Sequence, residues 1–163
     1  MIQNAKWILC PHRYGPMGKA EASPEFRKEF ELARAPKSAT LQICGLGFFD
    51  AKINGQSVTE RLLTPPFTAY DKRVYFEEYD VSALLKAGKN EIRVQLGGGW
   101  YCTAIRDAWQ FEAAPWKGPM QMIASLIADG ETVTSTGSDW QARESKMIES
   151  ELRGGEICDA TFE

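Results

Sequence analysis

The stretch FFDAKINGQSV, residues 48–58, gives the clearest indication of fold class, because it predicts two short strands joined by a tight turn. Apolar and polar side chains alternate from Phe48 to Ile53, which is typical of a strand with one buried face. Asn54-Gly55 follows directly, and this dipeptide accepts positive φ at both central positions of a type I′ turn. The stretch therefore predicts a β-hairpin.

Similar patterns recur along most of the chain, and helix-period stripes are nearly absent. Further strands are expected at residues 26–32, 39–45, 74–79, 91–96, 120–128, 131–136 and 141–150. Asp80 before an apolar run that Gly88 ends predicts a single helical turn. Many short strands separated by turn residues predict an all-β sandwich of the jelly-roll, or galactose-binding-like, kind.

Composition sets limits on partners. The 163 residues are 44% apolar and 25% charged, which suits a single folded domain over residues 1–163. The net charge of -3 without a basic run excludes nucleic acid as a partner. The longest apolar stretch, residues 120–128, is too short for a bilayer, which needs roughly 20 residues, so no membrane partner is expected. We expect a cytoplasmic protein, or a periplasmic one if a signal peptide has been removed.

No cofactor or metal is predicted. The cysteines are far apart and form no C-x-x-C pair, so they read as buried free thiols: Cys10, Cys44, Cys102 and Cys158. Calcium stays undecided, because Asp71, Asp80 and Asp107 lie near loops but form no contiguous ligand loop.

Catalytic residues are not apparent either. Glu77 and Glu78 point to opposite faces of a strand and cannot flank one glycosidic bond. Glu149 and Glu151 share a face, as carboxylates on exposed strands often do. His12, the only histidine, reads as a loop residue. We therefore expect no catalysis by this chain.

Aromatic side chains are the better candidates for binding. Trp7 and Trp140 lie in strand-like surroundings and are expected in the core. The irregular segment 97–119 contains or borders four rings expected to be more exposed: Trp100, Tyr101, Trp109 and Trp116. Flat rings on a β scaffold stack on the apolar faces of sugars, so these four predict contact with a ligand or with a neighbouring domain.

Five ordered motifs resemble the N-terminal β-sandwich domain of bacterial α-L-rhamnosidases, glycoside hydrolase family 78. They are GLGFFDAKING (45–55), LTPPFTAYDKRV (63–74), Tyr79-Asp80-Val81 leading to Leu84-Leu85, LGGGWY (96–101) and GEICDA (155–160). Departures are Cys158 in place of the usual tyrosine, Thr161 in place of arginine, and Pro66-Phe67 in place of a typical Gly-Trp.

The resemblance implies an accessory module of a longer enzyme whose hydrolytic site lies in a separate (α/α)6 barrel. The implied partners are the catalytic domain of the same parent chain and a rhamnose-containing glycan. Trp100, Tyr101, Glu156 and Asp159 match family positions and are candidates for that contact. Glu156 and Asp159 fit a domain-positioning role equally well, because residues 153–163 are expected to lead toward the next domain. An autonomous carbohydrate-binding module is the alternative, and a self-sufficient hydrolase is disfavoured.

Overall fold

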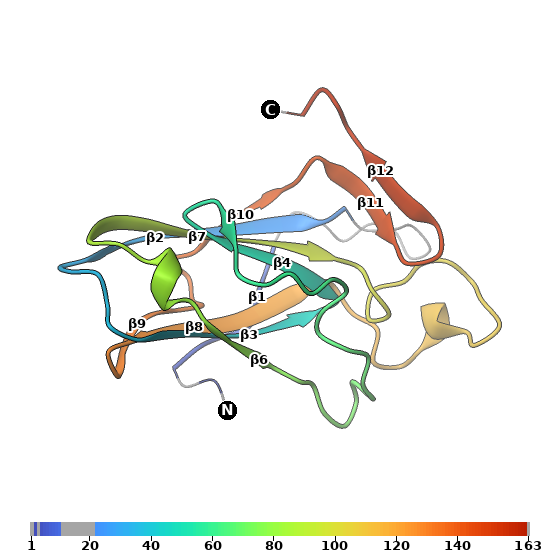
Figure 1. Ribbon diagram of the computed structural model, residues 1–163. Helices are drawn as coiled ribbons and strands as arrows, with labels where there is room; N and C mark the ends of the chain where they lie inside the picture. Colours follow the sequence, from blue (N-terminus) through green and yellow to red (C-terminus); the bar gives the residue numbers. More distant parts are fainter. Residues whose placement is uncertain (1, 3, 11–21, 163) are drawn as a thin grey trace.

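The computed structural model describes residues 2, 4–10 and 22–162, and it shows two antiparallel sheets packed face to face (Figure 1). The first sheet has the order β1 (Ile8–Leu9), β8 (Gln121–Ala128), β3 (Ala39–Leu46) and β6 (Glu77–Asp80), with β9 (Glu131–Ser135) also paired to β8. The second has the order β10 (Gln141–Glu144), β2 (Pro24–Leu32), β7 (Gly88–Gly97), β4 (Phe48–Ile53) and β5 (Gln56–Ser57). This confirms the predicted all-β sandwich.

Four short elements of the described residues lie outside these two layers. A separate hairpin of β11 (Met147–Glu151) and β12 (Gly155–Cys158) stands above the second sheet in Figure 1. Two 3-10 turns complete the described part of the chain, η1 (Ser82–Leu84) and η2 (Phe111–Ala113). The first is the predicted helical turn, and Asp80 Oδ1 accepts hydrogen bonds from the backbone N–H and hydroxyl of Ser82.

The core fills the space between the sheets. Alternate residues of β7 are buried, and the same alternation runs through β4, as the period of two requires. The largest fully buried side chains include Phe26 of β2, Leu41 and Ile43 of β3, and Ile92 of β7. Cys44 is also buried, and burial raises the pKa of its thiol to about 12, so it packs as a neutral apolar group.

The chain changes sheets at Gly47. β3 ends at Leu46 in one sheet and β4 begins at Phe48 in the other, so a single residue turns the corner. Gly47 has φ +110, and a Cβ there would lie 2.2 Å from the carbonyl oxygen of Gly97. Only glycine fits, because both its backbone conformation and the close approach exclude a side chain.

Tight turns close two of the hairpins, and the turn at Asn54-Gly55 is the predicted one. Asn54 and Gly55 have φ of 52 and 82, and Asp129 and Gly130 have φ of 49 and 86, as type I′ turns require. The first turn is also tied to the rest of the sandwich, because the Asn54 side chain donates to the carbonyl of Leu84 at 2.8 Å.

The strand expected over residues 141–150 is in fact two. β10 pairs with β2, and β11 leaves the sheet to pair with β12. The break is fixed by Ser23, whose carbonyl accepts from the N–H of Ser145 and whose N–H donates to the carbonyl of Met147. The strand expected over 74–79 begins only at Glu77.

Some side-chain expectations were wrong. Trp7, which directly precedes β1, is exposed. Cys158 is exposed on β12, whereas Cys10 and Cys102 are buried as expected, and each of the four cysteines is a thiol outside any disulfide. Trp140 is buried as expected and its indole N–H donates to the carbonyl of Ser135. His12 lies outside the described residues.

The corner can be tested with paired glycine substitutions. Gly47→Ala is expected to lower the free energy of unfolding by about 3–4 kcal/mol, from left-handed strain and backbone overlap together. Gly55→Ala is the matched control, because Gly55 also has positive φ but a Cβ there meets nothing within 4 Å. The Gly55→Ala control should lower the free energy of unfolding by only about 1–2 kcal/mol. If urea unfolding showed the same loss of unfolding free energy for both variants, the close approach of Gly47 and Gly97 would be contradicted.

Candidate functional site

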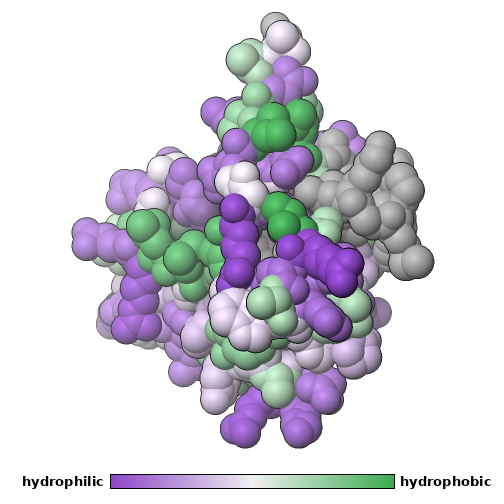
Figure 2. Space-filling model, turned by 90° about the vertical axis from the view of Figure 1, so that its right-hand side faces the viewer, coloured by the Kyte–Doolittle hydropathy of each residue, from purple (hydrophilic) through white to green (hydrophobic). Residues whose placement is uncertain are grey.

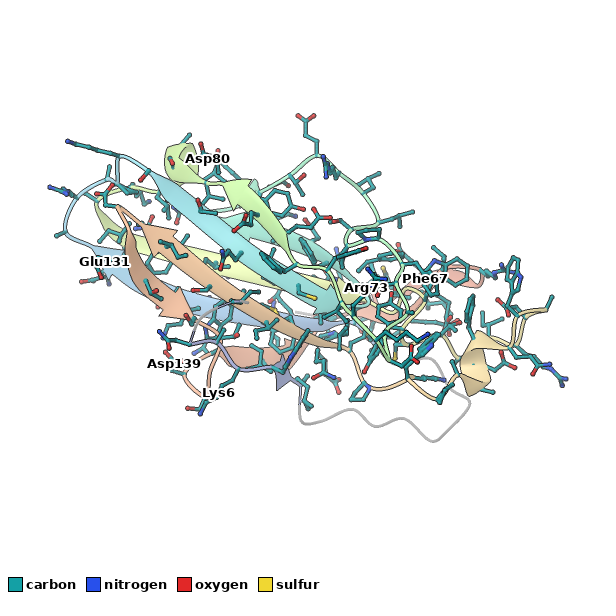
Figure 3. The ribbon with its side chains drawn as sticks, turned by 90° about the horizontal axis from the view of Figure 1, so that it is seen from below. Lys6, Phe67, Arg73, Asp80, Glu131 and Asp139 are labelled. Atoms are coloured by element: carbon teal, nitrogen blue, oxygen red, sulfur yellow. The ribbon has the colours of Figure 1, made fainter. Side chains whose placement is uncertain are left out.

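Seven aromatic rings gather at one end of the sandwich, where the segments 64–76 and 98–119 meet. This aromatic cluster consists of Phe67, Tyr70, Trp100, Tyr101, Trp109, Phe111 and Trp116. Phe67 joins the two segments, because its ring centroid lies 5.6 Å from those of Tyr70 and Phe111 and 6.4 Å from those of Trp100 and Trp116. Figure 3 shows Phe67 and Arg73 toward this end, away from Glu131 and Asp139.

The cluster has a buried side and a solvent side. Tyr101 is only 8% exposed and its ring packs 5.2 Å from that of Tyr70, so the expectation of an exposed Tyr101 was wrong. Burial, with Cys44 and Tyr101 nearby, raises the pKa of Tyr70 to about 12, which keeps its phenol neutral. Trp109 is 63% exposed and Phe67 is 47% exposed, so these two rings are available to a partner.

Arg153, which lies in the turn between β11 and β12, contacts two tryptophan rings of the cluster. Its guanidinium carbon lies 4.3 Å from the ring centroid of Trp109 and 5.4 Å from that of Trp100. Arg153 also forms an ion pair of 3.4 Å with Asp107, whose carboxylate accepts from the backbone N–H of Trp109 at 2.8 Å. The exposed indole is therefore positioned by a cation and a buried carboxylate, although most of its surface remains in solvent.

Glu151 of β11 connects the β11–β12 hairpin to the loop of residues 98–119. It is only 4% exposed, which contradicts the expectation of an exposed strand carboxylate. Its two oxygens accept from the hydroxyl of Thr103 at 2.8 Å and from the backbone N–H of Ala104 at 2.7 Å. Glu151 is buried because it contacts Thr103 and Ala104, which are distant in sequence. No local pattern in the sequence predicts this contact. Both oxygens have structural partners, so Glu151 reads as an anchor for the loop.

The structure places the remaining two candidates on the hairpin. Glu156 is exposed in β12. Asp159 follows β12, and the hydroxyl and backbone N–H of Thr161 lower the pKa of its carboxyl. The backbone N–H of Asp159 also donates to the carbonyl of Lys146. Asp159 thus shapes the chain after the hairpin, while the four predicted aromatic residues come together in the cluster.

Among residues 2, 4–10 and 22–162, no three His, Cys, Asp or Glu side chains are grouped so that they could hold a metal ion. The carboxylate of Asp80 accepts a hydrogen bond from Ser82. The carboxylate of Asp107 accepts one from Trp109 and forms an ion pair with Arg153. Nor does this described part contain a helix with the length and apolar character needed to cross a membrane.

The fold and the aromatic cluster define a β-sandwich domain with a ring-lined end. The family model described as the α-L-rhamnosidase N-terminal domain matches residues 34–163. An α-L-rhamnosidase of Formosa agariphila is 32% identical over 98% of this chain and 18% of its own length. One from Streptomyces avermitilis is 31% identical over 91% of this chain and 15% of its own. The chain belongs to the α-L-rhamnosidase N-terminal domain family.

Solved structures agree with this assignment. The α-L-rhamnosidase of Aspergillus terreus superposes with a TM-score of 0.90 and 28% identity, over 99% of this chain and 19% of the other. A lectin from Pleurotus ostreatus superposes with a TM-score of 0.54 at 16% identity, which shows a shared fold alone. The chain thus spans about a fifth of the length of the rhamnosidases that it matches.

The anchoring role of Glu151 can be tested by truncation. Glu151→Ala leaves the Ala104 N–H and the Thr103 hydroxyl without their carboxylate, and should lower the free energy of unfolding by about 2–3 kcal/mol. Glu149→Ala, two residues earlier on the same strand, is the control and should change it by less than about 0.5 kcal/mol. Urea unfolding measures both, and a negligible loss in Glu151→Ala would show that the loop is held by other contacts.

Proposed function

We propose that this chain is a non-catalytic accessory domain of an α-L-rhamnosidase. In this proposal it packs beside a catalytic (α/α)6 barrel and helps the parent protein recognise the terminal α-L-rhamnosides that it hydrolyses. The observation that carries the proposal is membership of the N-terminal domain family at about a fifth of the relatives' length. Most of the polypeptide of such a relative, including room for a catalytic domain, lies outside the matched region.

The hydrogen bonds and ion pair made by Glu151 and Glu77 support a non-catalytic role for these two carboxylates. An inverting glycosidase needs an acid and a base roughly 6.5–9.5 Å apart with space for water and sugar between them. Glu151 has both oxygens engaged by the loop. Glu77 accepts a hydrogen bond from the Tyr79 hydroxyl and lies 3.9 Å from the Arg61 guanidinium. These carboxylates are held by structural partners.

The aromatic cluster supports a role in sugar recognition. L-Rhamnose carries a methyl group and C–H edges that pack on aromatic rings, and Trp109 offers a large exposed ring held in place by Arg153. Its position is fixed before a ligand arrives, so little side-chain entropy is lost on binding. The same observation favours the second candidate function, an autonomous carbohydrate-binding module, because the exposed ring belongs to this chain alone.

Titration of the 163-residue chain with L-rhamnose and a rhamnosylated disaccharide tests the recognition role. We expect saturable shifts of the Trp109 indole resonance and of amides in residues 98–117, measured by NMR. Trp109→Ala should weaken binding by about tenfold, the loss of one stacked ring. Trp7→Ala is the matched control, since it removes an exposed tryptophan outside the cluster.

The outcomes separate a role in sugar recognition from a role in packing alone. Saturable binding by the chain alone supports sugar recognition, which the accessory domain and the autonomous module share. Absence of shifts at millimolar sugar would contradict recognition by this chain in isolation and restrict its role to packing beside the catalytic domain.

A further inference from the structure

A second apolar surface lies on the segment between β5 and β6, next to the aromatic cluster. The large hydrophobic side chains that this segment leaves exposed, beyond the cluster residue Phe67, are Leu62, Leu63, Val74, Tyr75 and Phe76. We call these five residues the leucine patch. Leu62 is 88% exposed and Leu63 is 62% exposed. Single exposed apolar residues are ordinary, but a group from one segment indicates an interaction surface.

The backbone holds the leucine patch in place. Leu63 has φ +55, a left-handed conformation that costs a leucine about 1–2 kcal/mol. The next residue, Thr64, is buried, and its carbonyl accepts from the N–H of Phe49 in β4 at 2.9 Å. Farther along, the hydroxyl of Thr68 donates to the carbonyl of Arg73 at 2.7 Å. The two leucines are thus presented to solvent by a fixed segment at an energetic cost, which favours a role outside this chain's own core.

A groove adjoins the patch and shares Tyr75 and Phe76 with it. The groove has a volume of about 560 Å³, and the rest of its lining includes Arg61, Pro66 and Glu77. Apolar side chains beside charged ones are typical of interfaces between domains of one chain, which are more polar than obligate interfaces. Figure 2, which faces this end of the molecule, shows apolar side chains grouped on its left flank among hydrophilic ones.

We propose that the leucine patch and this groove dock on the catalytic region of the same polypeptide. The inference rests on the proposed function and specifies the face by which the domain packs. Relatives carry about four-fifths of their chain outside the matched region, so a domain of this kind has a large neighbour to contact. The side chains of Leu62 and Leu63 have no hydrogen-bonding group for sugar hydroxyls, so their exposure favours a protein partner over a glycan.

Hydrogen exchange measures this docking directly. We would compare the 163-residue chain alone with the full-length polypeptide that contains it. Peptides covering residues 59–79 are expected to exchange at least tenfold more slowly in the full-length protein. Leu62→Glu should remove that protection there and leave the melting temperature of the 163-residue chain unchanged, because Leu62 is almost fully exposed in it.

Ile157→Glu is the matched control, since it places the same charge on an exposed apolar residue of β12. This control should keep the protection of residues 59–79. Protection confined to the hairpin 147–158 would overturn the inference and leave the proposed packing intact, whereas equal exchange throughout both proteins would overturn the packing itself. Concentration-dependent protection of residues 59–79 in the 163-residue chain alone would identify a second copy as the partner, and would also overturn the inference.

Discussion

The close approach of two backbones at Gly47 and Gly97 is the constraint on which the rest of the structure depends. β3 and β4 lie in different sheets with one residue between them, so the corner at Gly47 sets how the sheets face each other. A Cβ on Gly99 would also lie 3.3 Å from the N–H nitrogen of Phe48, so the chain leaving β7 packs on the same corner. The sandwich and the start of the aromatic loop are therefore fixed at one point.

The second level of organisation is polar and connects the loop to the C-terminal hairpin. Glu151 binds the loop through Thr103 and Ala104, and Arg153 binds it through Asp107 and two tryptophan rings. A two-stranded hairpin is at best marginally stable alone, so these contacts also stabilise β11 and β12. The aromatic cluster and the C-terminal hairpin are therefore parts of one assembly.

Much of the fold could be predicted, because a period of two and the Asn54-Gly55 and Asp129-Gly130 turns are local signals. The break in the strand over 141–150 could not, since it depends on hydrogen bonds to Ser23, more than a hundred residues away in sequence. For the site, the sequence indicated Trp100, Trp109 and Trp116 through their place in an irregular segment. It missed Phe67, Tyr70 and Phe111, which join the cluster only through tertiary contacts.

The most direct test of the central claim is an assay of the 163-residue chain with an aryl α-L-rhamnoside, followed by release of the coloured aryl product. We expect no release above the uncatalysed rate, because in the proposed function the catalytic carboxylates belong to a separate barrel. Sustained turnover by the purified chain, lost on its thermal unfolding and kept through further purification, would instead make this sandwich an enzyme in its own right.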